Sequence, residues 1–150
     1  MRSTVQTLLF LLFPLFLSAQ CPVLDLTLLQ YLQRAGLDDK QNAIIKLGFD
    51  LRSSVEKDGI AVHRYYRCWY TTRNQTAIYD QVLMWDLGTN SLVYLMRDRH
   101  EYDSLRNSIE SRHGNSGGNL DFYAGKMFFY RFGSQLMDGE EYFSVSIAFR

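Results

Sequence analysis

The sequence predicts a single α+β domain. An N-terminal helical pair and a third helix should pack on one face of a mostly antiparallel sheet of about six or seven strands. Residues 60–97 hold aromatic-rich apolar segments separated by Gly, Asn, Thr and Ser, which is typical of an antiparallel meander. Apolar residues recur at helical spacing before and after this run. With 150 residues, 47% hydrophobic and 21% charged, the chain has the size and composition of one globular domain.

The first residues follow the three-part plan of a secretory signal peptide. Arg2 supplies a positive charge, residues 8–17 are apolar apart from the ring of Pro14, and Ala19 ends a stretch of small residues. A run this short does not comfortably span about 30 Å of hydrocarbon, so a permanent membrane helix is disfavoured. We therefore expect cleavage near Ala19 and a mature, soluble domain of residues 20–150 that is secreted or periplasmic.

Export determines how the two cysteines are interpreted. In an oxidising compartment Cys21 and Cys68 are the only possible intramolecular pair, and their bond would clip the mature N-terminus onto the central meander. Two free thiols, or lipid attachment at Cys21 as in bacterial lipoproteins, are the alternatives. Gln20 disfavours lipid attachment because lipoprotein signals have a small residue directly before the cysteine.

The mature chain is expected to begin with a helix over residues 24–35. Its apolar residues fall at the spacing of one helical face, so this face can pack against the rest of the domain. Asp25 or Thr27 can cap the helix start. Gly36 follows directly, and we expect it to end the helix in a left-handed conformation.

Two further helices are predicted from capping signals. Residues 39–47 follow Asp38 as the expected cap and stop at Gly48. The third helix follows Asp98, and Glu101 occupies the position from which a capping-box carboxylate reaches back to the helix start. It should end near residue 114, before a stretch rich in Gly, Ser and Asn.

The first strands are predicted from alternating side chains. Residues 49–55 suit a strand with one wet face, with Phe49 and Leu51 on its inner side. A turn follows, with Gly59 at positive φ, and the return strand covers residues 60–70. One side of that strand carries Val62, Arg64, Tyr66, Cys68 and Tyr70; the other carries Ala61, His63, Tyr65, Arg67 and Trp69. Because neither side is cleanly polar, we expect it to be covered on both faces.

The remaining strands complete the predicted sheet. Residues 77–87 and 92–97 form a hairpin, and residues 120–123 and 126–132 flank a tight turn. Residues 142–149 give the cleanest alternation in the chain. We expect Phe143, Val145, Ile147 and Phe149 on the inner side and Tyr142, Ser144, Ser146 and Arg150 outside.

Two parts of the chain show a weak internal similarity, called the echo below. Residues 39–67 and 98–132 each read as a helix followed by two strands around a Gly-containing turn. This suggests two α-β-β units laid into one sheet. The alternative is that an α+β domain of this size shows such an echo by chance.

No catalytic or metal site is predicted. The densest group of potential metal ligands is Asp98, His100, Glu101 and Asp103. Acidic side chains are expected at a helix start because they interact favourably with the helix dipole. These four side chains also point in directions that cover more than half of the helix circumference, so they do not converge on one metal ion. No metal or other cofactor is therefore predicted. His63 and Cys68 are separated by an odd number of residues on one strand, which points them to opposite faces and disfavours a thiol–imidazole dyad.

Arginine and aromatic residues concentrate on the meander and its echo. They are Arg64, Tyr65, Tyr66, Arg67, Trp69, Tyr70, Tyr130 and Arg131. Tyr, Trp and Arg dominate binding hot spots because each buries a large area and keeps a polar group available. The alternative is that these are ordinary amphipathic sheet residues that shield a core.

The sequence therefore favours an exported, non-catalytic module that binds a protein or a small ligand through its sheet. The alternative is a small extracytoplasmic enzyme of the hydrolase type, with a site between sheet and helices. A pocket where His63 or His100 meets a carboxylate would favour the enzyme. The formal charge of +0 gives no reason to expect a nucleic-acid partner.

Overall fold

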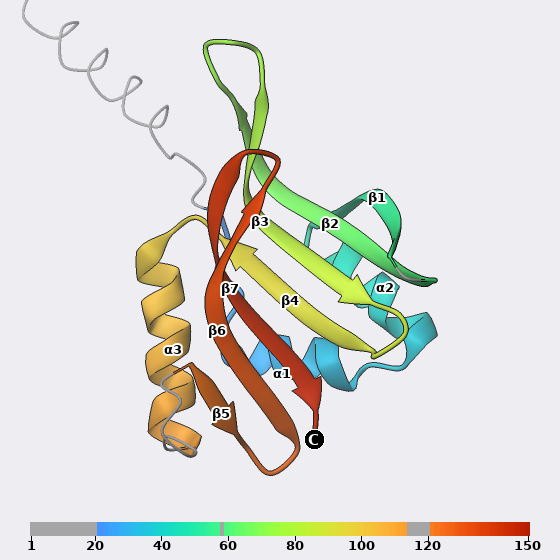
Figure 1. Ribbon diagram of the computed structural model, residues 1–150, viewed down its shortest axis with the longest axis vertical. Helices are drawn as coiled ribbons and strands as arrows, with labels where there is room; N and C mark the ends of the chain where they lie inside the picture. Colours follow the sequence, from blue (N-terminus) through green and yellow to red (C-terminus); the bar gives the residue numbers. More distant parts are fainter. Residues whose placement is uncertain (1–20, 58, 114–120) are drawn as a thin grey trace, which may run out of the picture.

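The computed structural model describes residues 21–57, 59–113 and 121–150, so the predicted signal peptide lies outside the described residues. The described chain confirms the α+β class, with three helices packed on a seven-stranded sheet (Figure 1). The elements are α1 (Leu26–Arg34), α2 (Leu37–Lys46), β1 (Asp50–Lys57), β2 (Ile60–Thr71), β3 (Ala77–Asp86), β4 (Ser91–Met96), α3 (Arg99–His113), β5 (Phe122–Ala124), β6 (Phe128–Met137) and β7 (Glu140–Phe149).

The sheet has the order β1-β2-β3-β4-β7-β6-β5, and every neighbouring pair is antiparallel. The predicted meander forms β2, β3 and β4. After β4 the chain passes through α3 to the far edge and returns through β5 and β6, so that β7 pairs with β4. The suggested pair of α-β-β units is not confirmed.

All three helices contribute to a core on one face of the sheet. Leu29, Ile44 and Leu105, one from each helix, are buried against strand residues such as Tyr94 and Val145. Burying one large apolar side chain contributes about 1.5–3 kcal/mol, so this cluster, the larger of the two in the described residues, is the main source of hydrophobic stabilisation. No helix in the described parts of the chain is long and apolar enough to cross a membrane.

The other face of the sheet, called the open face below, carries a smaller core of its own. The end of the β6–β7 hairpin lies beside the start of β3 (Figure 1), and the Tyr142 hydroxyl donates to the Tyr79 carbonyl at 2.8 Å. Tyr142 is consequently only 3% exposed, packed in one cluster with Tyr66, Val82 and Leu95. The prediction that Tyr142 lies outside was wrong because the curled sheet covers part of its own open face.

Phe149, which was expected inside, is 44% exposed. It is the last residue of β7, where its partner across the ladder is Phe128 at the start of β6. The alternation is right for Val145 and Ile147, which are buried, but it fails at this end of the strand. The hydrophobic core therefore does not extend to the last residue of β7.

The helix boundaries correct two capping predictions. Asp25 caps α1, accepting from the Leu28 N–H at 2.8 Å. Gly36 has φ −58, so it is not left-handed; it is instead the N-cap of α2, and its carbonyl accepts from the Lys40 N–H at 2.8 Å. The α2 helix therefore starts before Asp38, the expected cap. Gly48 has φ 85 and follows the helix end, in agreement with its predicted role.

The alternation predicted for β1 breaks at a bulge. The register with β2 shifts between Leu51 and Ser53, which leaves an extra residue on β1. Leu51 is 41% exposed rather than facing the core. Gly59 has φ 76, so the predicted positive φ in the following turn is confirmed.

Candidate functional site

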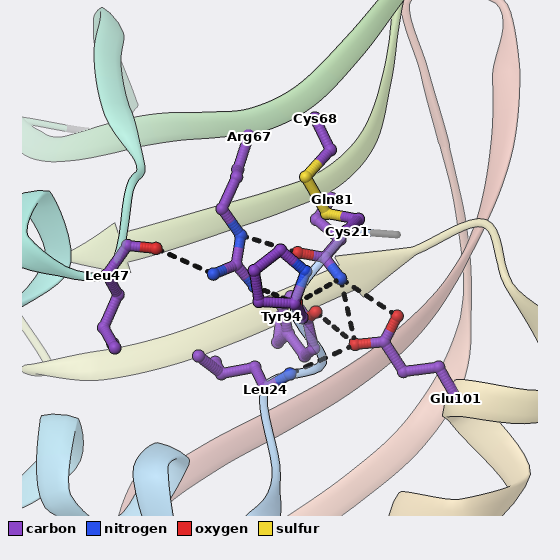
Figure 2. Close-up of a disulfide and its surroundings, with 9 residues drawn as sticks. Cys21, Leu24, Leu47, Arg67, Cys68, Gln81, Tyr94 and Glu101 are labelled. Carbon is purple, nitrogen blue, oxygen red and sulfur yellow. Dashed lines mark hydrogen bonds between the residues drawn. A yellow bond between two sulfur atoms is a disulfide. The ribbon is translucent and has the colours of Figure 1, made fainter. Parts of the chain in front are cut away.

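A disulfide fixes the first described residues to the sheet. Cys21 is bonded to Cys68, with their Cα atoms 5.8 Å apart, which confirms the predicted pair (Figure 2). The bond occupies the sulfur atom that lipid attachment at Cys21 would need. Residues 21–24, called the strap below, are thereby held against β2 and β3.

Arg67 of β2 binds the strap through the Pro22 carbonyl. Its guanidinium donates to the Gln81 side chain at 2.8 Å, to the Leu47 carbonyl at 2.7 Å and to the Pro22 carbonyl at 2.5 Å. The side chain also lies over the Phe49 ring, 4.3 Å from its centroid. One buried arginine thus joins the strap, the end of α2 and two strands.

Glu101 completes this network from α3. Figure 2 shows its carboxylate facing Gln81, whose amide donates to both oxygens at 3.2 and 3.1 Å. The Tyr94 hydroxyl donates to the same carboxylate, and the Leu24 N–H of the strap lies 3.4 Å from it. Glu101 is only 5% exposed. The capping-box prediction was therefore wrong, because this carboxylate points into the sheet rather than back to the helix start.

Burial determines the protonation behaviour of the network. Burial lowers the pKa of Arg67, while Tyr94 and Glu101 beside it oppose that shift. Burial also raises the pKa of Tyr94, and the negative charge of Glu101 raises it further. The tyrosine is accordingly a neutral donor at physiological pH. Arg67 and Glu101 carry opposite charges and are bridged through the amide of Gln81, so the network links the strap, the sheet and α3.

A second buried cation ties α2 to the β3–β4 turn. Lys40 is fully buried, and its ammonium donates to the Asn90 side chain at 2.6 Å and to the Gln33 carbonyl at 3.3 Å. The ammonium also lies 5.4 Å from the centroid of the Trp85 ring. Burial lowers the pKa of Lys40 to about 8.

Lys40→Met should remove a pH dependence of stability. In the wild type the unfolded chain keeps this proton up to about pH 10.5, whereas the folded chain releases it from about pH 8. The free energy of unfolding should therefore rise across this window by up to about 1.4 kcal/mol per pH unit. Urea unfolding between about pH 7.5 and 9, below the range in which unfolded tyrosines lose their protons, should show that rise in the wild type and in Lys46→Met, an exposed control on α2. Equal slopes in Lys40→Met and the wild type would contradict it.

The predicted Arg and aromatic residues do not gather on one face. The buried ones are Tyr65, Tyr66, Arg67 and Tyr130. Tyr65 and Tyr130 belong to the core beneath the helices, whereas Tyr66 belongs to the cluster on the open face. Trp69 is 60% exposed and, like Tyr70, lies where β2 leaves the body of the sheet; Arg131 is exposed on β6, and Arg64 is half-buried on the open face. Of these residues, Arg64 is the one that lines a cavity on the open face.

The open face is hollowed beside its small core. This hollow, called the sheet cavity below, has a volume of about 270 Å³. Its apolar lining is Val55, Val62, Met84 and Val93, and its polar lining is Arg64, Asp86, Ser91 and Gln135. Of these lining residues, Arg64 alone was a predicted binding residue, because β1 and β6, which carry Val55 and Gln135, come together here only through the curl of the sheet.

A larger cavity of about 540 Å³ lies where α3 begins, and is called the helix cavity below. It is lined by Cys21, Val23, Asp80, Gln81, Arg97, Asp98, His100 and Glu101. Arg97 is paired with Glu140 at 2.9 Å. Burial raises the pKa of Asp80 despite the opposing positive charge of Arg97. His100 therefore shares one hollow with several carboxylates, between the sheet and a helix.

The His, Cys, Asp and Glu side chains in the described parts of the chain form no group of three or more that could hold a metal ion. Comparison of the chain with protein-family models, curated proteins and solved structures found no match.

Proposed function

We propose that this protein is an exported, non-catalytic binding module, and that its ligand is a small, largely apolar molecule held in the sheet cavity. The observation that carries the proposal is the cavity itself. Apolar side chains line it, and a few polar groups converge on it, which is the usual composition of a small-molecule site.

The size and setting of the cavity support a small ligand rather than a flat protein interface. Liquid water takes about 30 Å³ per molecule, so the cavity holds the volume of about nine waters and suits a ligand of about ten non-hydrogen atoms. Of the eight Arg and aromatic residues that would form a flat face, four are buried in the sheet, and the other four are spread over different parts of it. Export is supported by the apolar leader in the sequence and by the disulfide, since such bonds persist in oxidising compartments.

Filling the cavity should abolish binding. Val93 lies on β4 and faces the cavity, so the indole of Val93→Trp would occupy the space that the ligand needs. We expect calorimetry to detect binding of octanoate to the wild type and at least a tenfold loss of affinity in Val93→Trp. The matched control is Leu136→Trp, at a side chain that is 73% exposed and does not line the cavity. Binding that survives in Val93→Trp, with the thermal midpoint unchanged, would exclude this cavity.

A hydrolase-type enzyme is the second candidate, supported by the helix cavity. His100 and the partly buried carboxylate of Asp80 line it together, and such groups can serve in acid–base chemistry. Turnover of an ester or amide substrate panel that is lost in both Asp80→Asn and His100→Gln would support this candidate. If the wild type shows no turnover and binds octanoate, the result supports the binding module over the enzyme.

A further inference from the structure

Arg64 is the cationic side chain that lines the sheet cavity. It lies on β2 opposite Ser53 of β1 and Met84 of β3, in the floor of the open face. Its Nε atom is excluded from solvent and has no hydrogen-bond partner among the described residues. The described residues also give its guanidinium no ion pair.

The acid that lines the same cavity, Asp86, forms no ion pair with Arg64 among the described residues. Asp86 uses one carboxylate oxygen to accept from the Gly88 and Thr89 N–H groups at 2.8 and 3.1 Å, so the β3–β4 turn holds it. The remaining polar lining, Ser91 and Gln135, is uncharged. The cavity thus combines apolar walls with one guanidinium whose hydrogen-bonding capacity is not met within the described protein.

From this arrangement we infer that the ligand of the sheet cavity is a compact apolar monoanion, with a carboxylate that pairs with Arg64 and a hydrocarbon part that lies against Val62, Met84 and Val93. The inference rests on the proposed function. A guanidinium matches a carboxylate with two parallel N–H···O bonds, and such a charge-assisted pair is stronger beside apolar walls than in bulk water. A neutral ligand would leave Arg64 unpaired, and a cationic ligand would add repulsion.

The test compares three probes of equal chain length: octanoate, 1-octanol and octylammonium. Calorimetry on the full mature protein should show octanoate binding at least tenfold more tightly than 1-octanol, and no binding of octylammonium. Arg64→Met should weaken octanoate binding about ten- to hundredfold, as expected for a lost charge-assisted hydrogen bond, and should change 1-octanol binding by less than threefold. Arg64→Lys keeps the charge without the two-pronged geometry, so its affinity should fall between those of Arg64→Met and the wild type.

Arg131→Met, at an exposed arginine on β6, is the matched control and should bind octanoate like the wild type. Retained 1-octanol binding shows that Arg64→Met is folded. If octanoate and 1-octanol bind equally well and both are blocked by Val93→Trp, the monoanion inference fails while the proposed function stands. If no probe binds to the wild type, both fail. Self-association that Arg64→Met abolishes would place a second copy of the chain in the cavity and overturn the inference.

Discussion

Arg67→Met is expected to lower the free energy of unfolding by about 3–5 kcal/mol, because it removes a buried guanidinium with three hydrogen bonds and leaves a buried carboxylate without its nearby positive charge. The variant would leave the buried carboxyl group of Glu101 with no cation in the network. It would also remove the Arg67 donor from the Leu47 carbonyl, and it would leave the Pro22 carbonyl with the Gln81 amide alone, at 3.1 Å. Urea unfolding at pH 7 measures this loss directly.

The matched control is Arg131→Met, because this arginine is exposed and its removal should change stability by less than about 0.5 kcal/mol. The combined variant Arg67→Met/Glu101→Gln removes both charges, so it should lose less stability than the sum of the single variants. Strictly additive losses, or a loss of less than about 1 kcal/mol in Arg67→Met, would show that the network does not tie the fold together as described.

The variant Cys21→Ala/Cys68→Ala should lose about 4 kcal/mol of unfolding free energy. The bond joins residues 47 apart in sequence, and the chain-entropy model gives about this value for a loop of that length. The strap would also be released from Arg67 and Glu101, which adds to the loss.

Reduction provides the control for the disulfide. Wild-type protein unfolded in the presence of a thiol reductant should show the same loss as the double variant, whereas the double variant should not respond to reductant. Unchanged stability in the double variant would mean that the network holds the strap without the covalent bond.

Much of the fold was predictable because alternation and helical spacing are local. The meander, the last strand and the helices follow from apolar residues repeated at fixed spacing, and Val145 and Ile147 are buried as expected. The disulfide was predictable because the chain has only two cysteines. The β1 bulge and the start of α2 were not, since both depend on backbone hydrogen bonds that side-chain patterns do not reveal.

The buried charges were the main failure of sequence reasoning. Lys40 and Glu101 occupy helix positions where a charged residue is normally taken as solvent-exposed, yet both are buried. Each has its partners on other elements, such as Asn90 for Lys40 and Tyr94 for Glu101. A pattern read along one helix does not contain these tertiary contacts.

The sheet cavity could not be predicted from the sequence either, because it too depends on tertiary contacts. Val55 and Gln135 lie on strands at opposite ends of the chain, and they line one hollow only because the sheet curls. Arg64 was singled out for its residue type and its place on the meander. Its unpaired Nε becomes visible only when the neighbouring strands are in place.

The most direct test is to locate bound octanoate by methyl NMR on residues 20–150. The account predicts intermolecular contacts from the alkyl chain to the methyl groups of Val62, Met84 and Val93, together with a shift of the Arg64 Nε signal. Contacts to Val23 in the helix cavity instead, or saturating octanoate that leaves the three open-face methyl groups unshifted, would contradict it.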